Sequence, residues 1–304
     1  MLYRGRFAPT PSGPLHFGSL VAALASWLEA RSCGGTWLVR IDDLDPPREV
    51  PGAADRILRQ LEAFGLHWDE TVRYQSQRSD AYQAAVTQLV DSGHAFHCRL
   101  TRKELASLNH CHPGISAAVA ADADTAVRLH VPDRQLCYSD NIQGHVCNNL
   151  HRDGGAFVIR RRDGLFGYQL ACALDDADEA ITHVLRGADL LGSTLRQRWL
   201  LECLKRPIPD YAHLPVVSSG RNVKLSKSAG SNALDPNRAN QLLSAALSCM
   251  GLQPPADLQS TSPAALLAWA TTHYPERQWP PGHQQPLPDG LNVEDTVEPP
   301  PQPT

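Results

Sequence analysis

The apolar positions near the start of the chain follow a strand pattern, then a helix pattern, then a strand pattern again. Residues 3–8 favour a short strand that ends at Pro9. Beyond it, apolar side chains recur at helical spacing on one face, at Leu20, Leu24, Trp27 and Leu28. Gly34 and Gly35 end this helix, and residues 37–41 predict a buried strand. This order of elements predicts a βαβ unit, the start of a parallel sheet.

Later segments continue the α/β pattern around an irregular middle region. Two helices are predicted at residues 57–64 and 82–92. Residues 94–156 are rich in Asn, Asp, Gly and His, and short strands are expected at 126–131 and 157–160. Regular strands and helices then return at 181–185, 195–203, 213–217, 237–250 and 264–272. From Pro275 onward the chain is rich in proline, which predicts disorder.

These patterns predict an α/β protein with a Rossmann-like parallel sheet, an inserted small α+β domain and a short C-terminal helical region. The first half of the sheet domain is expected at residues 1–93 and the second half at 161–220, with the insertion at 94–160. A lysine-containing loop and helices follow at 221–274, and a Pro-rich disordered tail at 275–304.

Composition narrows the class of protein. Apolar residues make up 42% and charged residues 20% of the chain, which excludes a wholly disordered protein, a collagen and a coiled coil. No uncharged apolar run reaches the roughly 18 residues of a membrane span, and the N-terminus has no apolar signal core. We therefore expect a cytoplasmic protein.

Charge leaves a nucleic-acid partner open. The formal net charge is −4, and residues 289–304 carry acidic side chains but no Lys or Arg. The rest of the chain is therefore neutral, which still permits a local basic surface. Arg160, Arg161 and Arg162 form the best such run, which fits a solvated face and a phosphate contact equally well.

The eight cysteines are expected to be reduced thiols. The chain is long and has no leader, unlike a small secreted disulfide scaffold, and no pair has C-x-x-C spacing. Cys172 and Cys203 lie in apolar runs and are predicted core residues.

The turn after the first strand, R-F-A-P-T-P-S-G-P-L-H-F-G-S at residues 6–19, is the first candidate for chemistry. A helix that starts at Gly18–Ser19 would present unpaired N–H groups and its positive dipole end to an anion. Gly18 has no Cβ to keep a base or phosphate away, and His16 can donate to a phosphate oxygen. By itself, the H-x-G pattern is more typical of an ordinary turn.

The sequence K-L-S-K-S at residues 224–228 is the second candidate. Lys224 and Lys227 on a closing loop would stabilise a departing pyrophosphate, although a solvated surface loop has the same pattern. The third candidate, R-I-D-D-L-D at residues 40–45, places carboxylates after the carboxyl end of a central strand, where α/β sheets bind ligands. An acidic turn without function fits this segment as well.

In this order the three segments resemble the class I aminoacyl-tRNA synthetases. Residues 6–19 look like the HIGH region and residues 224–228 like KMSKS, with Ser19 in place of the last His, as is usual in the glutamate-specific branch. The segments R-F-A-P-T-P-S-G, R-I-D-D-L-D and R-G-A-D (residues 186–189) resemble glutamyl-tRNA synthetases.

Further segments resemble the glutamyl-Q tRNA(Asp) synthetase family: D-P-P-R-E at 45–49, Y-Q-S-Q-R at 74–78 and R-R-D-G-L-F-G-Y-Q-L-A at 161–171. The resemblance covers about residues 4–250. The part after Ser228 is too short for the large anticodon-binding region of a glutamyl-tRNA synthetase. The resemblance implies activation of L-glutamate with ATP and Mg²⁺, and its transfer to the queuosine base in the anticodon of tRNA-Asp.

The resemblance also implies residue roles. The residues that would line the glutamate pocket are Arg6, Ala8, Thr10, Asp42, Tyr168 and Arg186. Those that would bind ATP are His16, Gly18, Ser19 and Lys227, and those expected to act in catalysis are His16, Lys224 and Lys227. Two arginines suit a substrate with two carboxylates. Without the resemblance, a surface ion pair with Asp189 would be the better interpretation of Arg186.

Two departures from the family concern Asp42 and zinc. The family usually has Glu at position 42, where the carboxylate faces the substrate's amino group, so the shorter Asp affects glutamate affinity. Relatives open a zinc site with C-x-C, whereas this chain has Cys98 followed by Leu100. Cys98, Cys111 and two histidines would still make four ligands. Zinc is not expected, nor is any other bound metal.

Three rival functions follow from the same residues. They are a truncated glutamyl-tRNA synthetase that charges a 3′ end, a catalytically inactive RNA-binding paralogue, and another nucleotidyltransferase on the same sheet. We expect L-glutamate and queuosine-containing tRNA-Asp as partners, no membrane association, and a monomer.

Overall fold

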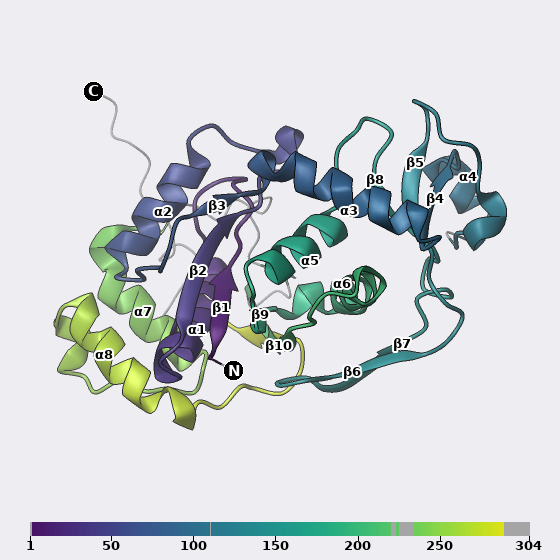
Figure 1. Cartoon of the computed structure of the whole chain (residues 1–304). Helices are drawn as coiled ribbons and strands as arrows, with labels where there is room; N and C mark the ends of the chain where they lie inside the picture. The colour runs from purple at the N-terminus through teal and green to yellow at the C-terminus, as the bar shows by residue number, and fades with distance from the viewer. Residues whose placement is uncertain (1, 110, 220–222, 225–233, 289–304) are drawn as a thin grey trace. The chain divides into compact units, whose positions relative to one another are not determined.

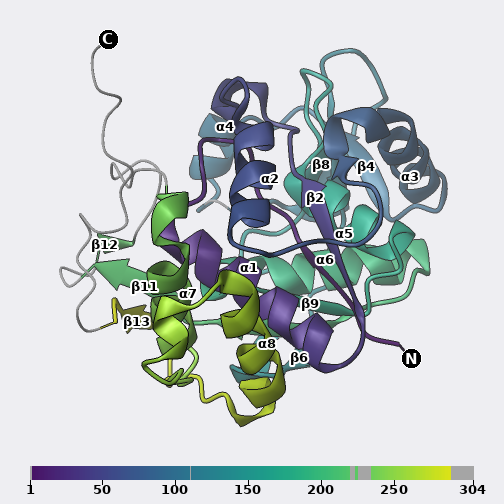
Figure 2. The same cartoon turned by 90° about the vertical axis from the view of Figure 1, so that its left-hand side faces the viewer.

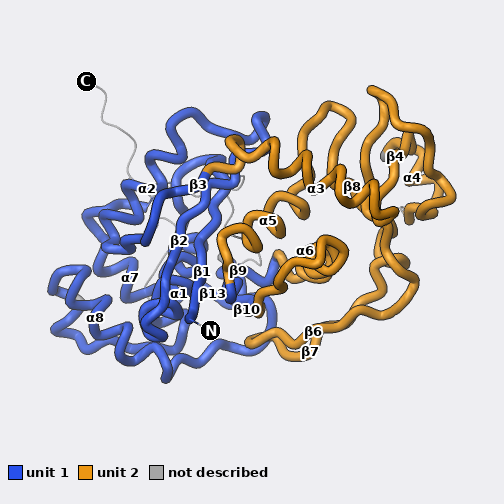
Figure 3. The backbone as a smooth tube through the Cα atoms, viewed as in Figure 1, with its two compact units in different colours: residues 1–73, 182–189, 212–304 blue, residues 74–181, 190–211 orange. Residues whose placement is uncertain are grey.

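A computed structural model describes residues 2–109, 111–219, 223–224 and 234–288 of the 304-residue chain (Figure 1). It divides into two compact units (Figure 3). Unit 1 contains residues 1–73, 182–189 and 212–304, and unit 2 contains residues 74–181 and 190–211. The five predicted segments are not tested by this division and stay a prediction.

Unit 1 begins with the predicted βαβ element. Strand β1 (Arg4–Phe7) leads into α1 (Phe17–Ser32), which returns to β2 (Thr36–Ile41). The two strands are parallel, with Arg4 opposite Thr36 and Phe7 opposite Val39, so the prediction is confirmed. A Cβ on Gly35 would lie 2.4 Å from the backbone oxygen of Tyr3. Glycine is therefore required where the chain turns from α1 back to the sheet.

The helices of unit 1 bury α1. Helix α7 (Ala239–Ser248) and α8 (Pro263–His273) pack against α1, as Figure 2 shows. Helix α2 (Ala53–Ala63) follows β2, and β9 (His183–Gly187) lies beside β1, where Thr182 N donates to the carbonyl oxygen of Arg4 at 2.9 Å. The described part of the chain has no helix long and apolar enough to cross a membrane.

The end of the sheet region differs from the prediction. The single strand expected at 213–217 is two strands, β10 (Asp210–Leu214) and β11 (Val216–Ser219), because Pro215 between them has no N–H to donate to a ladder. Within the predicted disordered tail, η8 (Tyr274–Glu276) and β13 (Gln284–Pro286) are ordered, and β13 pairs in parallel with β11. Strand β12 (Val223–Lys224) pairs antiparallel with β11.

Unit 2 contains small antiparallel sheets and a helical layer. Strands β4 (Ala95–Cys98) and β8 (Phe157–Arg160) flank β5 (Ala126–Leu129), and β6 (Leu136–Asp140) forms a hairpin with β7 (Gly144–Asn148). The remaining helices are α3 (Ser79–Asp91), α4 (Arg102–Ala106), α5 (Tyr168–Asp178) and α6 (Leu191–Leu204), and the two-residue β3 (Arg73–Tyr74) stands at the unit boundary.

Helix α5 and the β6–β7 hairpin are absent from the sequence prediction. Helix α5 packs against α6 and α3, and all its residues from Leu170 to Asp176 are buried. A helix buried on nearly every side has no apolar stripe for a periodicity argument to detect. Buried Asp175 is tolerated because Gln75 Nε2, Arg78 Nε and Tyr82 Oη donate to its carboxylate.

The cysteine prediction is wrong for one pair. Cys137 and Cys147 form a disulfide across the β6–β7 hairpin, whereas reduced thiols were expected throughout. The sequence has no signal for this bond, because the nine residues between the two cysteines show neither a hairpin pattern nor C-x-x-C spacing. Cys172 and Cys203 are free and buried, as predicted.

Candidate active site

The turn between β1 and α1 forms a helix N-terminus with a histidine cap. His16 is the N-cap of α1, and its Nδ1 accepts the N–H of Ser19 at 3.2 Å. Its Nε2 lies 3.0 Å from the Ser19 hydroxyl oxygen. Because Nδ1 accepts, the neutral ring carries its proton on Nε2 and donates to Ser19 Oγ. The predicted ATP-binding residues His16 and Ser19 are therefore one hydrogen-bonded pair.

Gly18 keeps the imidazole of His16 in this position. A Cβ at residue 18 would lie 3.3 Å from both Cε1 and Nδ1 of His16. A side chain there would make a tight contact, and the ring would have to shift by a few tenths of an ångström. Besides opening the helix N-terminus to a ligand, the glycine thus preserves the histidine cap.

Gln60 on α2 joins this turn to the segment after the lysine loop. Its side-chain oxygen accepts from Leu15 N at 2.9 Å, and its Nε2 donates to the carbonyl oxygen of Leu234 at 3.1 Å. Leu234 N also donates to the carbonyl oxygen of Leu15 at 3.3 Å. All three residues are buried. The turn after β1 and the segment that follows the lysine-containing loop are thereby fixed to each other.

The Pro-rich turn is also bonded to the carboxylate segment. Asp42 N donates to the carbonyl oxygen of Pro9, and Val50 N to that of Pro11, both at 3.0 Å. Thr10 stands between these two anchors. The backbone therefore brings Thr10 of the predicted glutamate pocket together with Asp42.

Asp42 is half of a buried ion pair. Arg40 Nε donates to Asp42 Oδ1 at 2.8 Å, and the two side chains are 0% and 6% exposed. Arg40 and Asp42 share one face of the strand because they are two residues apart. Arg6 lies on this face as well, since it pairs with Leu38. The ion pair is shielded from water, and Arg40 offsets part of the negative charge of Asp42.

Two buried arginines distinguish the candidate glutamate pocket. Arg6 on β1 is 4% exposed and Arg186 on the neighbouring β9 is 6% exposed. Arg186 Nε donates to Nε2 of buried His213 at 3.1 Å. Arg186 is thus buried, whereas the alternative interpretation, an ion pair with Asp189, placed it at the surface. Buried guanidinium groups on adjacent strands suit a ligand with carboxylates.

The remaining predicted residues lie elsewhere or outside the described residues. Ala8 is half-buried and follows β1 directly. Tyr168 begins α5 in unit 2 and is 40% exposed, so the structure does not test its place beside the unit 1 residues. The backbone of Lys224 pairs with Ser218, and Lys227 lies outside the described residues.

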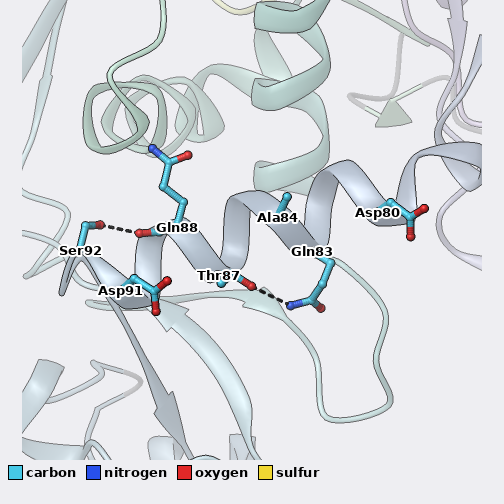
Figure 4. A pocket seen from close by; sticks show the side chains of 7 residues that line it. All are labelled: Asp80, Gln83, Ala84, Thr87, Gln88, Asp91 and Ser92. Atoms are coloured by element: carbon cyan, nitrogen blue, oxygen red, sulfur yellow. Dashed lines mark hydrogen bonds between the residues drawn. The ribbon is translucent and has the colours of Figure 1, made fainter.

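A surface hollow on α3 holds none of these residues. Figure 4 shows its lining between Asp80 and Ser92, where Gln83 donates to Thr87 at 3.3 Å and Ser92 Oγ to the carbonyl oxygen of Gln88 at 2.8 Å. The lining side chains bond within their own helix. We assign this hollow no role.

Cys98 and Cys111, the cysteines considered for a zinc site, make different contacts, and His110 lies outside the described residues. Cys98 Sγ accepts a hydrogen bond from the backbone N–H of Leu100 at 3.3 Å and lies 3.2 Å from Nε2 of His112. Cys111 instead donates its S–H to the carbonyl oxygen of His151 at 2.9 Å. Burial, and then Arg128, lower the pKa of His112 to about 4. Among the described residues this region brings no three metal ligands together, and we derive no chemistry from zinc here.

Sequence reasoning missed three side chains that hold the site: Arg40, Gln60 and His213. Arg40 stands two residues before Asp42, and this i, i+2 spacing of opposite charges on a strand was an available signal. Gln60 and His213 lie in a helix and a strand of ordinary composition, so no motif marks them.

Comparisons with known proteins match the part of the chain that contains these residues. Residues 3–242 match the family described as "tRNA synthetases class I (E and Q), catalytic domain". The chain is 50% identical over 273 residues to the "Glutamyl-Q tRNA(Asp) synthetase" of Ectopseudomonas mendocina (strain ymp), covering 90% of this chain and 93% of the relative. A protein of that name from Pseudomonas aeruginosa is also 50% identical, with the same coverage.

A solved structure with a similar fold is that of a glutamate tRNA ligase from Elizabethkingia meningosepticum in complex with its amino acid. The TM-score is 0.71 at 25% sequence identity, over 88% of this chain. The match covers 64% of that ligase, so this chain spans less than two thirds of its length.

Proposed function

This chain belongs to the family of class I tRNA synthetase catalytic domains for E and Q, and from that premise we propose that it is a glutamyl-Q tRNA(Asp) synthetase. The proposed enzyme activates L-glutamate with ATP and transfers the glutamate to the queuosine base in the anticodon of tRNA-Asp. The observation that carries this proposal is the 50% identity to relatives of that name over 93% of their length. The α/β catalytic fold with its parallel β1–β2 pair agrees with it.

The amino acid binds through charge complementarity. Arg6 and Arg186 supply two buried cations for the two carboxylates of glutamate. Asp42 supplies an anion for the ammonium group, and its pairing with Arg40 fixes the direction of its Oδ1. The family resemblance adds Ala8, Thr10 and Tyr168 to the residues that bind glutamate.

Activation is an in-line displacement on ATP. An oxygen of the glutamate α-carboxylate bonds to the α-phosphorus, and the bond from that phosphorus to the bridging oxygen of pyrophosphate breaks. The N–H groups at the start of α1, with His16 and Ser19, hold the nucleotide next to Gly18. Lys224 and Lys227, with the Mg²⁺ that enters bound to ATP, neutralise the departing pyrophosphate.

Transfer completes the reaction. A hydroxyl oxygen on the cyclopentene ring of queuosine attacks the carbonyl carbon of glutamyl-adenylate. An ester bond to the tRNA forms, and AMP leaves with the electron pair of the broken acyl–phosphate bond. The enzyme's partners are thus L-glutamate, ATP and queuosine-containing tRNA-Asp. We propose that it acts as a monomer in the cytoplasm, where these substrates occur together.

The deciding experiment measures transfer of labelled glutamate, with ATP, onto three RNAs. These are tRNA-Asp with queuosine, tRNA-Asp without queuosine, and tRNA-Glu. We expect label on the first RNA alone. Label on tRNA-Glu would instead indicate a minimal glutamyl-tRNA synthetase, and no label on any RNA would indicate an inactive paralogue. Nuclease digestion of the labelled RNA is the control, because label on an anticodon fragment indicates queuosine and label on the 3′-terminal adenosine indicates ordinary charging.

A further inference from the structure

The β6–β7 hairpin (Figure 1) carries two cysteines and a histidine close together on one face. Cys137 on β6 lies directly opposite Cys147 on β7, and Ser139 lies opposite His145. Side chains two residues apart on a strand share a face, so all four point the same way. Cys137 and His145 are exposed and Cys147 is half-buried. Solvent therefore reaches the cluster.

The opposite face fixes the hairpin to unit 2. Tyr138 is buried and stacks edge-on with Tyr211, at 6.0 Å between ring centroids. The turn is closed by Asp140, whose Oδ1 accepts the N–H groups of Ile142 at 3.0 Å and Gln143 at 2.9 Å. The cluster therefore stands on a rigid support rather than on a loose loop.

The three candidate donor atoms are close enough to share one ion. The Sγ atoms of Cys137 and Cys147 and a ring nitrogen of His145 all lie within 4.8 Å of one another. His145 Nε2 is 3.1 Å from Cys147 Sγ. A tetrahedral zinc site with Zn–S bonds of about 2.3 Å and Zn–N bonds of about 2.0 Å needs donor atoms some 3.5–4 Å apart. Small side-chain rotations supply that spacing once the disulfide is reduced.

We propose that Cys137, His145 and Cys147 form a metal site for a thiophilic divalent cation of the Zn²⁺ type. The reduced hairpin binds one ion, two thiol protons are released, neutral His145 gives a nitrogen, and water takes the fourth position. The disulfide between Cys137 and Cys147 is the metal-free oxidised form of the same site. A disulfide oxidant such as oxidised glutathione takes the two electrons and two protons when it forms.

This site is separate from the Cys98 region, where relatives place zinc. Cys98 ends β4, whereas the cluster lies on β6 and β7, and it needs no residue from β4. Zinc bound to this chain would therefore use donors that the family pattern does not contain. The proposal does not depend on the proposed catalytic function.

The test uses the full chain, purified without a His-tag, reduced with a phosphine under anaerobic conditions and freed of metal with a chelator. Titration with Co²⁺ is followed by the thiolate-to-cobalt charge-transfer absorption, and Zn²⁺ is then added in competition. We expect one ion per chain in the reduced protein and none after oxidation. His145→Ala should weaken binding at least about tenfold, since loss of a direct ligand costs no less than loss of an outer partner.

Matched variants locate the ion. Cys137→Ser with Cys147→Ser should abolish the charge-transfer band, whereas Cys33→Ser, at an exposed free cysteine, should leave it unchanged. Far-UV circular dichroism confirms that the variants are folded, and the oxidised wild type provides a metal-free control without mutation. An absence of cobalt binding to the reduced wild type would overturn the proposal. So would binding that survives the double substitution and disappears in Cys98→Ser.

Discussion

Arg186 donates a hydrogen bond from Nε to Nε2 of His213 at 3.1 Å, with both side chains buried. The bond fixes the plane of the guanidinium group, and because Nε2 accepts, the neutral His213 ring carries its proton on Nδ1. A strand residue that no motif marks thereby positions a predicted substrate-binding arginine.

His213→Ala should raise the KM for glutamate about tenfold, because a bond to a charged group contributes about 1.5–3 kcal/mol. The kcat should change much less, since His213 positions Arg186 and does not touch the reacting atoms. His213→Gln, which keeps an acceptor, should recover part of the loss. Glutamate-dependent pyrophosphate exchange measures both constants, and equal KM values for the Ala and Gln variants would contradict the positioning role.

Asp42→Glu should preserve or improve the apparent affinity for glutamate. The longer side chain reaches further toward the substrate's ammonium group and restores the usual family residue. Asp42→Asn should raise the KM for glutamate strongly, because it removes the anion for the substrate's ammonium group and breaks the buried ion pair with Arg40. Steady-state exchange kinetics for both variants test the assignment. A sharp loss of activity in Asp42→Glu would count against placing residue 42 at the amino group.

Gln60→Leu should destabilise the fold by about 2–4 kcal/mol, because Leu15 N and the carbonyl oxygen of Leu234 each lose a buried partner. The KM for ATP should rise as well, since the same bonds fix the turn that ends in His16. Urea unfolding and exchange kinetics report the two effects. Gln88→Ala, at an exposed residue of α3, is the control and should stay within about 0.5 kcal/mol of the wild type.

Lys227→Ala should slow adenylate formation about a hundredfold or more while leaving the unfolding free energy unchanged, because the lysine acts on the departing pyrophosphate. Pyrophosphate exchange and urea unfolding of the same preparation separate the two quantities. Lys205→Ala, at the C-cap of α6, is the control, because it removes one lysine outside the candidate site. Exchange at the wild-type rate in Lys227→Ala would remove the residue from the mechanism.

Stability should fall as the pH drops from about 6.5 to about 4, in part because of His112. Burial lowers the pKa of His112 to about 4, so in this range the unfolded chain binds a proton that the folded chain does not. The contribution is at most about 3 kcal/mol, lost progressively as pH falls through this window. Urea unfolding at several pH values should give a shallower slope for His112→Asn. An unchanged slope would contradict the depressed pKa.

Much of the fold and of the candidate site was predictable because the signals are local. The βαβ unit follows from apolar periods within residues 3–41, and β1 and β2 pair in parallel as expected. His16, Gly18 and Ser19 form one turn, so their proximity needs no knowledge of the rest of the chain. Helix α5 was not predicted, because a helix buried on nearly every side shows no amphipathic periodicity in its sequence.

The supporting contacts could not be predicted, because each joins residues far apart along the chain. Nothing near Gln60 specifies that its amide will bridge Leu15 and Leu234, and nothing near His213 marks it as the acceptor for Arg186. The sequence thus established the βαβ unit, the candidate catalytic motifs and the family resemblance, since these depend on neighbouring residues. The tertiary structure decided the contacts of Gln60 and His213 and the Cys137–Cys147 disulfide. These depend on packing between distant segments and on strand register, which arise only when the chain folds.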